Sequence, residues 1–333
     1  MSVTFDVAVV GATGTVGETL VQILEEREFP LGQLYLLGSE ASVAQSVPFR
    51  GRNVRVKALD GFDFQQVKLV FFCTGEAVSQ AYVSKARAAG CTVIDLAGGQ
   101  GTPVVVPEVN PGIAEGLAMP ALIASPGSVA TGLALALAPL MPLLEIEQVN
   151  VTACLSMSSK GRDAIRELAR QTTELLNARP LEPRVFDRQV AFNLLPQVGE
   201  PDAAGHLALE KRAHRELREL LGLPLLKASI SCIQAPVFFG DSLAVSVRSS
   251  TPVDLEAVCA ALETAPSVEW TGADDYPTAV GDAVGQDVLY VGRVRTGLDD
   301  ACELNLWLTL DNVRKGAALN AVQLAELLIK RLS

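Results

Sequence analysis

The sequence is short of basic residues, nearly without histidine, and has no closely paired cysteines. Its 27 lysines and arginines are outnumbered by 38 acidic residues, which gives a net charge of −11. A field of that sign repels phosphate backbones and anionic lipids, so we expect neither nucleic acid nor membrane partners. The six cysteines form no CxxC pair, and there are only two histidines, His206 and His214. This usage predicts no metal site and a reduced, cytoplasmic protein.

One long stretch without charge, residues 116–144, does not predict a membrane span. The stretch is long enough to cross a bilayer, but it is interrupted by Pro120, Pro126, Pro139 and Pro142. These breaks indicate a buried strand, a loop and a core helix over 129–140.

The whole chain has 333 residues, of which 49% are hydrophobic. That is enough for two domains, each with its own core.

The first part of the chain alternates short apolar runs with helical stretches. Residues 7–10 form an apolar run that meets Gly11, and residues 15–26 follow with a helical period. Similar short runs recur at 34–37, 69–72, 93–96 and 121–124. Alternation of this kind predicts a parallel sheet covered by helices.

After about residue 127 the apolar runs become longer and alternate with polar residues, which indicates an antiparallel or mixed sheet. These runs are 147–155, 229–235, 243–249, 288–294 and 303–310. Predicted helices at 162–177, 207–221 and 255–264 would cover one face of that sheet. We expect the second face to present Val149, Val151, Val245 and Val247 to a second copy of the chain, forming a homodimer. A last helix, 316–332, has room to return to the first domain.

The strongest motif is the glycine loop Gly11-Ala12-Thr13-Gly14-Thr15-Val16-Gly17, between a predicted strand and helix. Glycines there allow a tight turn and the close approach of a pyrophosphate to the helix N-terminus. The loop therefore predicts dinucleotide binding; the alternative is a turn that only packs helix on strand. Glu40 follows the second strand, where a carboxylate binds ribose hydroxyls and repels a 2′-phosphate. NAD is thus favoured over NADP, unless Glu40 is simply a solvated loop residue.

Four motifs in order along the chain resemble those of aspartate-semialdehyde dehydrogenases. They are the glycine loop and the segments 103–110 (PVVVPEVN), 191–197 (AFNLLPQ) and 311–323 (DNVRKGAALNAVQ). The resemblance implies a two-domain fold of the glyceraldehyde-phosphate-dehydrogenase type and a dimer. A Rossmann-type dinucleotide-binding domain would comprise 1–127 and 312–333, with Gln323 among its cofactor-binding residues. An α+β catalytic and dimerisation domain would comprise 128–311.

The same resemblance implies that the family's catalytic set is replaced. In the family a cysteine thiolate forms a thioester-level intermediate, hydride passes to NADP, and a histidine acts as acid and base. Ser128 stands at the position of that cysteine and Asp241 at that of the histidine. Leu155 replaces an active-site glutamine, and Gln234 replaces the arginine that binds the substrate carboxylate.

We therefore expect a dehydrogenase-like protein without dehydrogenase activity, which binds NAD, a small molecule or a partner. One alternative is an oxidoreductase acting with NAD on another aldehyde or acyl substrate. A second is a hydrolase built from Ser128, His206 and Asp241. Cys154, next to Leu155, is interpreted as a packed core thiol rather than a replacement nucleophile.

Overall fold

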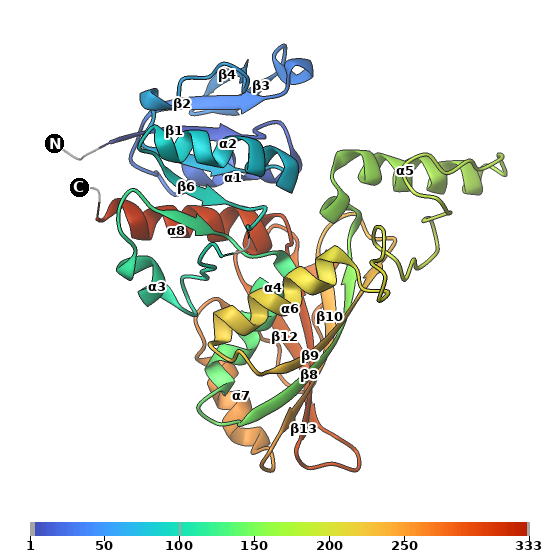
Figure 1. Ribbon diagram of the computed structural model, residues 1–333. Coiled ribbons are helices and arrows are strands. Elements are labelled where there is room, and N and C mark those ends of the chain that lie inside the picture. Colours follow the sequence, from blue (N-terminus) through green and yellow to red (C-terminus); the bar gives the residue numbers. More distant parts are fainter. Residues whose placement is uncertain (1–3, 100, 332–333) are drawn as a thin grey trace. The chain divides into compact units, whose positions relative to one another are not determined.

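The computed structural model describes residues 4–99 and 101–331 (Figure 1). The chain divides into two compact units. The first contains the residues up to Gly127 and those from Ala317 onward, and the second is Ser128–Gly316. The chain returns to the first unit after Gly316, later than the predicted domain boundary at 311/312.

The first unit is built on a seven-stranded sheet with the order β3-β4-β2-β1-β5-β6-β7. Neighbouring strands are parallel except for β3 and β4, which pair antiparallel. The predicted parallel sheet is confirmed, whereas the β3-β4 pair was not anticipated. The strands are β1 (Phe5–Val10), β2 (Leu31–Gly38), β3 (Ser46–Phe49), β4 (Arg52–Ala58), β5 (Leu69–Phe72), β6 (Thr92–Asp95) and β7 (Leu122–Ala124).

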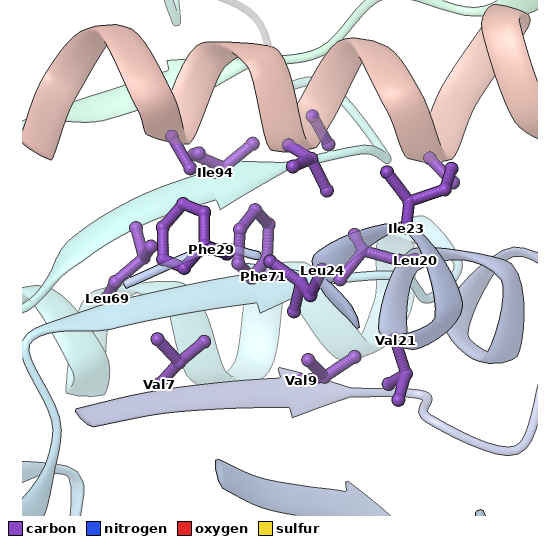
Figure 2. Packing of buried hydrophobic residues seen from close by; sticks show 14 of the residues in the cluster. Val7, Val9, Leu20, Val21, Ile23, Leu24, Phe29, Leu69, Phe71 and Ile94 are labelled. Atoms are coloured by element: carbon purple, nitrogen blue, oxygen red, sulfur yellow. The ribbon is translucent and has the colours of Figure 1, made fainter. Parts of the chain in front are cut away.

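Helices cover both faces of this sheet because alternate strand residues point to opposite sides. Val7 and Val9 of β1 belong to the core shared with α1 (Thr15–Glu26) and α8 (Leu319–Ile329). Figure 2 shows side chains of α1 gathered against Phe71 and Ile94 of the sheet. Ala8 and Val10 face α2 (Glu76–Ala88) on the other side. A further short helix, α3 (Pro111–Gly116), contacts α8.

The second unit is built on a six-stranded mixed sheet with the order β11-β12-β13-β10-β8-β9. The β8-β10, β10-β13 and β12-β13 pairs are antiparallel, and the β8-β9 and β11-β12 pairs are parallel. The predicted mixed sheet is confirmed. The strands are β8 (Ile146–Leu155), β9 (Lys227–Gln234), β10 (Asp241–Ser249), β11 (Val268–Trp270), β12 (Leu289–Thr296) and β13 (Glu303–Leu310).

One face of this sheet packs on helices α4 (Ser128–Leu137), α6 (Ala208–Leu221) and α7 (Leu255–Glu263). Helix α4 is buried all round, since every residue from Val129 to Leu137 is inaccessible to solvent. Helix α5 (Arg162–Leu176) instead packs on the turn Met157–Lys160 and has a small core of its own.

The prediction that four valines lie on the face of the sheet left uncovered by helices is wrong. Val149, Val151, Val245 and Val247 are all buried. They alternate with exposed or half-buried side chains such as Asn150 and Ser246, so the valines point toward the helices. On β8 and β10 the uncovered face instead presents polar or small side chains, among them Thr152 and Ala244.

Two segments differ from their predicted form. The helix predicted over 316–332 is regular from Leu319 to Ile329 and is preceded by a π-helical turn at Arg314–Ala318, while residue 332 lies outside the described residues. The charge-free stretch forms β7, α4 and a short 3-10 turn at Ala138–Leu140. Within the described residues, no helix is long and apolar enough to cross a membrane.

Candidate functional site

The glycine loop of the first unit has the geometry that dinucleotide binding requires. Gly11 has φ +81°, and a Cβ there would lie 2.5 Å from the carbonyl oxygen of Cys73. A Cβ on Gly17 would lie 2.2 Å from the carbonyl oxygen of Gly11, so a side chain is excluded at both positions. Gly14 is the N-cap of α1, and no side chain caps the helix. The first-turn N–H groups of Thr15, Val16 and Gly17 therefore remain suited to a phosphate.

The segment after β2 lies against this loop. The hydroxyl of Thr13 donates a hydrogen bond to Ser42 Oγ at 3.3 Å. Glu40 is exposed and begins the 3-10 turn Glu40–Ser42. Because β1 and β2 are parallel neighbours, their carboxyl ends share one edge of the sheet, where ligands bind in such folds. The predicted loop residues and Glu40 are thus brought together, and they fit a dinucleotide.

Gln323 belongs to α8 of the same unit. Its Nε2 donates a hydrogen bond to Glu108 Oε1 at 2.9 Å. Glu108 comes from the PVVVPEVN segment, so this bond ties two of the four sequence motifs together. Asn320, one turn earlier on α8, donates to the carbonyl oxygen of Val105 at 3.2 Å and to Ser125 Oγ at 2.9 Å.

In the second unit, Ser128 and Asp241 form a direct hydrogen bond. Ser128 is the first residue of α4, and Asp241 is the first residue of β10. Ser128 Oγ donates to Asp241 Oδ2 at 2.7 Å. Asp241 is fully buried, whereas Ser128 is half-buried. The carboxylate therefore lies behind the serine at the start of a buried helix.

Further polar groups complete what we call the serine-aspartate cluster, made of Ser128, Ser156, Ser158, Asp241 and Asn312. Asp241 Oδ1 accepts hydrogen bonds from the backbone N–H of Ser156 at 3.0 Å and from its hydroxyl at 3.1 Å. Asn312 Oδ1 accepts from Ser158 Oγ at 3.0 Å and from the N–H of Gly240 at 3.1 Å. Sequence reasoning missed Ser156 and Ser158 as site residues. The sequence feature that could have identified these two serines is the polar run Ser156-Met157-Ser158-Ser159, which directly follows a predicted strand.

The position of Asp241 sets its protonation. Burial raises the pKa of the Asp241 carboxyl from its ordinary value of 3.8 to about 6. The nearby negative charge of Asp311 raises the pKa further, while the hydrogen bonds from Ser156 and Ser128 oppose the shift. At neutral pH the group is therefore ionised, held by hydroxyl and amide donors.

Leu155 and Gln234 are parts of the fold beside this cluster. Leu155 is buried on the helix-covered face. Gln234 is buried too, and its Nε2 donates to the carbonyl oxygens of Leu155 at 2.9 Å and Ser156 at 2.8 Å. The Gln234 amide thus joins the ends of β8 and β9. Its Oε1 has no hydrogen-bond partner among the described residues.

The suggested triad of Ser128, His206 and Asp241 is wrong. In such a triad the imidazole stands between serine and carboxylate, but Asp241 contacts Ser128 directly. His206 is exposed in the loop before α6, where its backbone N–H donates to Asp202 Oδ1 at 2.9 Å. His214 is half-buried on α6, and burial and Arg218 lower its pKa.

None of the thiols with a shifted pKa is poised as a thiolate. Burial raises the pKa of Cys73, Cys91, Cys154, Cys232 and Cys259. Cys154 is half-buried rather than packed in the core as expected, and the negative charge of Asp241 raises its pKa further. In the described part of the chain, no three histidine, cysteine or acidic side chains are placed to hold a metal ion.

Comparison with known proteins gives consistent matches over nearly the whole chain. The semialdehyde dehydrogenase NAD binding domain matches residues 6–115, and the semialdehyde dehydrogenase dimerisation domain matches residues 137–315. A USG-1 protein homolog from Azotobacter vinelandii is 60% identical, with 99% of each chain covered. Aspartate-semialdehyde dehydrogenase 2 from Vibrio cholerae is 40% identical, also with 99% of each chain covered.

Solved structures show the same likeness. The structure of a probable aspartate-semialdehyde dehydrogenase from Pseudomonas aeruginosa has 54% identity and a TM-score of 0.97, covering 99% of this chain and 100% of that one. Aspartate semialdehyde dehydrogenase II from Vibrio cholerae, complexed with ASA, has 41% identity and a TM-score of 0.95, covering 99% of each chain. By sequence and by two-domain fold, the chain belongs to the aspartate-semialdehyde dehydrogenase family.

Proposed function

We propose that this chain is a nucleotide-binding member of its family that does not catalyse the family's dehydrogenase reaction. The observation that carries the proposal is the 2.7 Å hydrogen bond from Ser128 Oγ to Asp241 Oδ2. By the sequence resemblance, these two residues take the places of the nucleophilic cysteine and the catalytic histidine. A nucleophile and its base are thereby replaced by a hydroxyl bonded to a buried carboxylate.

Ser128 is a poor nucleophile in this setting. A thiolate is readily populated at neutral pH, whereas a serine hydroxyl needs a base that removes its proton during attack. Asp241 has a pKa of about 6, so its carboxylate is far too weak a base to hold the hydroxyl deprotonated. The hydrogen bond instead keeps the proton on Ser128.

Two neighbouring replacements support the same proposal. The amide of Gln234 is engaged with the carbonyl oxygens of Leu155 and Ser156. The amide carries no charge, so it does not replace the positively charged guanidinium group with which an arginine binds a substrate carboxylate through two N–H donors. Cys154 does not substitute for the missing thiol, because burial and Asp241 both favour its protonated form.

The nucleotide is proposed to be NAD rather than NADP. The support is Glu40, an exposed carboxylate on the segment that touches the glycine loop through Ser42 and Thr13. A carboxylate there accepts hydrogen bonds from ribose hydroxyls and repels a 2′-phosphate. When bound, NAD would supply a hydride acceptor, and the residues holding it would be Gly11, Gly14, Gly17 and the first turn of α1.

We further propose a homodimer in a reducing compartment. The match to a dimerisation domain over residues 137–315 supports a dimer of identical chains. All six cysteines are free thiols, which agrees with a reducing cytoplasm. A small-molecule ligand at Ser128 would contact a hydroxyl group that is hydrogen-bonded to the negatively charged carboxylate of Asp241.

A second candidate function is an oxidoreductase that acts with NAD on another aldehyde or acyl substrate. It is favoured by the 40% identity to a Vibrio cholerae protein named aspartate-semialdehyde dehydrogenase 2. A Ser128-based hydrolase has less support, since no histidine lies between Ser128 and Asp241.

Calorimetric titration with NAD and NADP, followed by an absorbance assay for nicotinamide reduction, separates these candidates. The proposal predicts micromolar NAD binding and no turnover of aspartate semialdehyde with phosphate. Turnover of a different aldehyde would favour the second candidate, and failure to bind either nucleotide would remove the nucleotide-binding part of the proposal.

A further inference from the structure

Two hydrogen-bond acceptors of the second unit are buried without a cation or a donor to match them. The first is the carboxylate of Asp241, which is 0% exposed and forms no ion pair within residues 4–99 and 101–331. The second is Oε1 of Gln234, also 0% exposed, which accepts no hydrogen bond from a described residue. An unpaired buried charge and an unmade buried hydrogen bond both cost free energy, so both groups need an explanation.

Both acceptors lie on the helix-covered face of the sheet, at the carboxyl ends of β8 and β9. Gln234 pairs with Leu155 across β9 and β8. On the other side of β8, Ser242 pairs with Cys154, so Asp241 stands in line with Leu155. All three side chains are buried on the face that α4 and α6 cover (Figure 1). Gln234 and Asp241 are therefore two strand spacings apart, ~10 Å between Cα atoms, with the apolar Leu155 between them.

Ser128 gives a ligand indirect access to the enclosed carboxylate. Its hydroxyl donates to Asp241 Oδ2 at 2.7 Å, and Ser128 is half-buried at the start of α4. Because the single hydroxyl proton is used in this bond, the oxygen of Ser128 can only accept from a ligand. Donation to an anion also makes that oxygen a stronger acceptor. A ligand at Ser128 must therefore supply a donor, and the charge of Asp241 favours a cationic one.

The Gln234 amide also requires a donor. Its Nε2 donates to the carbonyl oxygens of Leu155 at 2.9 Å and Ser156 at 2.8 Å. Carbonyl oxygens only accept, so the amide cannot be turned round, and Oε1 is directed away from both of them. A ligand group that reaches Oε1 must therefore carry an N–H or O–H. Ser128 and Gln234 thus place the same demand on a ligand from the two ends of one line of residues.

We propose that the second unit binds a small organic ammonium compound, whose charged nitrogen donates to Ser128 Oγ beside Asp241 and whose aliphatic part lies over Leu155. A second N–H or O–H of the ligand donates to Gln234 Oε1. The inference rests on the proposed loss of the dehydrogenase reaction, because it assigns a cation to a site whose counterpart in the family holds a substrate carboxylate. The ammonium group supplies the positive charge that no described side chain supplies to Asp241.

Three probes of similar length and different charge test the ligand class by calorimetric titration at pH 8. Asp241 is ionised at this pH, because its pKa is about 6. The probes are butylammonium chloride, butan-1-ol and sodium butyrate at equal ionic strength. We expect butylammonium to bind at least ~10-fold more tightly than butan-1-ol, and butyrate not to bind. The inference is wrong if butylammonium binds no more tightly than butan-1-ol, or if butyrate binds as tightly as butylammonium.

Asp241→Asn removes the charge and keeps the shape of the side chain. We expect the dissociation constant of butylammonium to rise ~10-fold or more in this variant. The matched control is Glu263→Gln, which makes the same change in net charge at an exposed position of α7 and should bind butylammonium like the wild type. Equal affinities in the wild type and Asp241→Asn would overturn the inference.

A fourth probe, 4-aminobutan-1-ol, tests the contact with Gln234. Its hydroxyl adds the donor that Oε1 lacks, so we expect the wild type to bind it ~5-fold more tightly than butylammonium. Equal affinities for these two probes would overturn the contact with Gln234.

The outcomes separate this inference from the proposed function. Turnover of aspartate semialdehyde would overturn the proposed loss of the reaction and, with it, the basis of the inference. If there is no turnover and Asp241→Asn binds butylammonium as the wild type does, the proposed function stands and only the ammonium site is wrong.

Discussion

Ser128 Oγ and Asp241 Oδ2 lie 2.7 Å apart although 113 positions separate the two residues in the sequence. The first turn of a buried helix and the first residue of a central strand meet there. Asp241 is fully buried, and Ser128 and Ser156 donate hydrogen bonds to its carboxylate. Several properties of the protein should therefore depend on this one carboxylate.

Asp241→Asn is expected to stabilise the protein at neutral pH. The folded-state pKa of about 6 lies above the ordinary value of 3.8, so the folded chain binds more protons than the unfolded chain between these pH values. The stability contributed by this group is complete below pH ~4 and is lost as the pH rises through ~6. Removing the charge should thus raise the free energy of unfolding at pH 7.5 by ~1 to 3 kcal/mol.

Urea denaturation at pH 7.5 and pH 4.5 measures this effect, and the advantage of the variant should shrink at the lower pH. Asp282→Asn is the matched control. Asp282 is exposed, and hydrogen bonds from Thr278 lower its pKa, so this variant should gain no stability at pH 7.5. If Asp241→Asn lowers the free energy of unfolding equally at both pH values, the carboxylate of Asp241 is not destabilised by its burial, and the prediction is wrong.

The glycine loop should respond differently at its third and second glycines. Gly17→Ala places a Cβ against the backbone of Gly11, so it should cost ~1 to 3 kcal/mol of stability. A Cβ on Gly14 would lie 3.3 Å from Gly11 O, with no other close contact. Gly14→Ala should therefore keep the melting temperature within a few degrees and weaken NAD binding, because the second glycine lets the backbone approach the pyrophosphate.

Thermal melts and calorimetric titration of both variants provide the check. If Gly14→Ala binds NAD as tightly as the wild type, the pyrophosphate does not lie over this loop.

Nucleotide preference should depend on Glu40. Glu40→Arg replaces a repulsive charge with an attractive one next to the expected 2′-phosphate, a change of ~2 to 3 kcal/mol or about two orders of magnitude in the NADP dissociation constant. Glu263→Arg, at an exposed position of α7 in the second unit, is a control for the change in net charge. Calorimetry that finds equal NADP affinity in the wild type and Glu40→Arg would place the ribose elsewhere.

The sequence was sufficient to predict the local features of the fold. The glycine loop and α1 follow from neighbouring residues, and the strands of the second unit follow from alternation. Alternation defines two faces of a strand but does not say which one the helices cover, so Val149 and Val245 were placed on the wrong side. The pair β3 and β4 was missed because its exposed positions carry charges such as Arg52 and Arg55.

The sequence predicted single residues of the candidate site but not the contacts between them. Ser128 and Asp241 were found through the resemblance to a family. The serine-aspartate cluster forms where the end of β8, the start of β10 and the end of β13 lie side by side. These strand ends are far apart in the sequence, so no local pattern predicts the contacts of Ser156, Ser158 and Asn312. Likewise, Asp241 was expected near the site, but its contact with Ser128 requires the register of β8, β10 and α4 together.

Phosphate-dependent reduction of NAD or NADP with aspartate semialdehyde tests most directly whether the protein has lost the reaction of its family. We predict no turnover by the wild type, nor by Ser128→Cys alone or with Gly127→Asn. Residues that act as a unit show their effect only together, and a thiol at position 128 would face the anionic Asp241, which raises its pKa. Turnover of wild type at or above ~0.1 per second, still below the usual enzyme range, would contradict the claim.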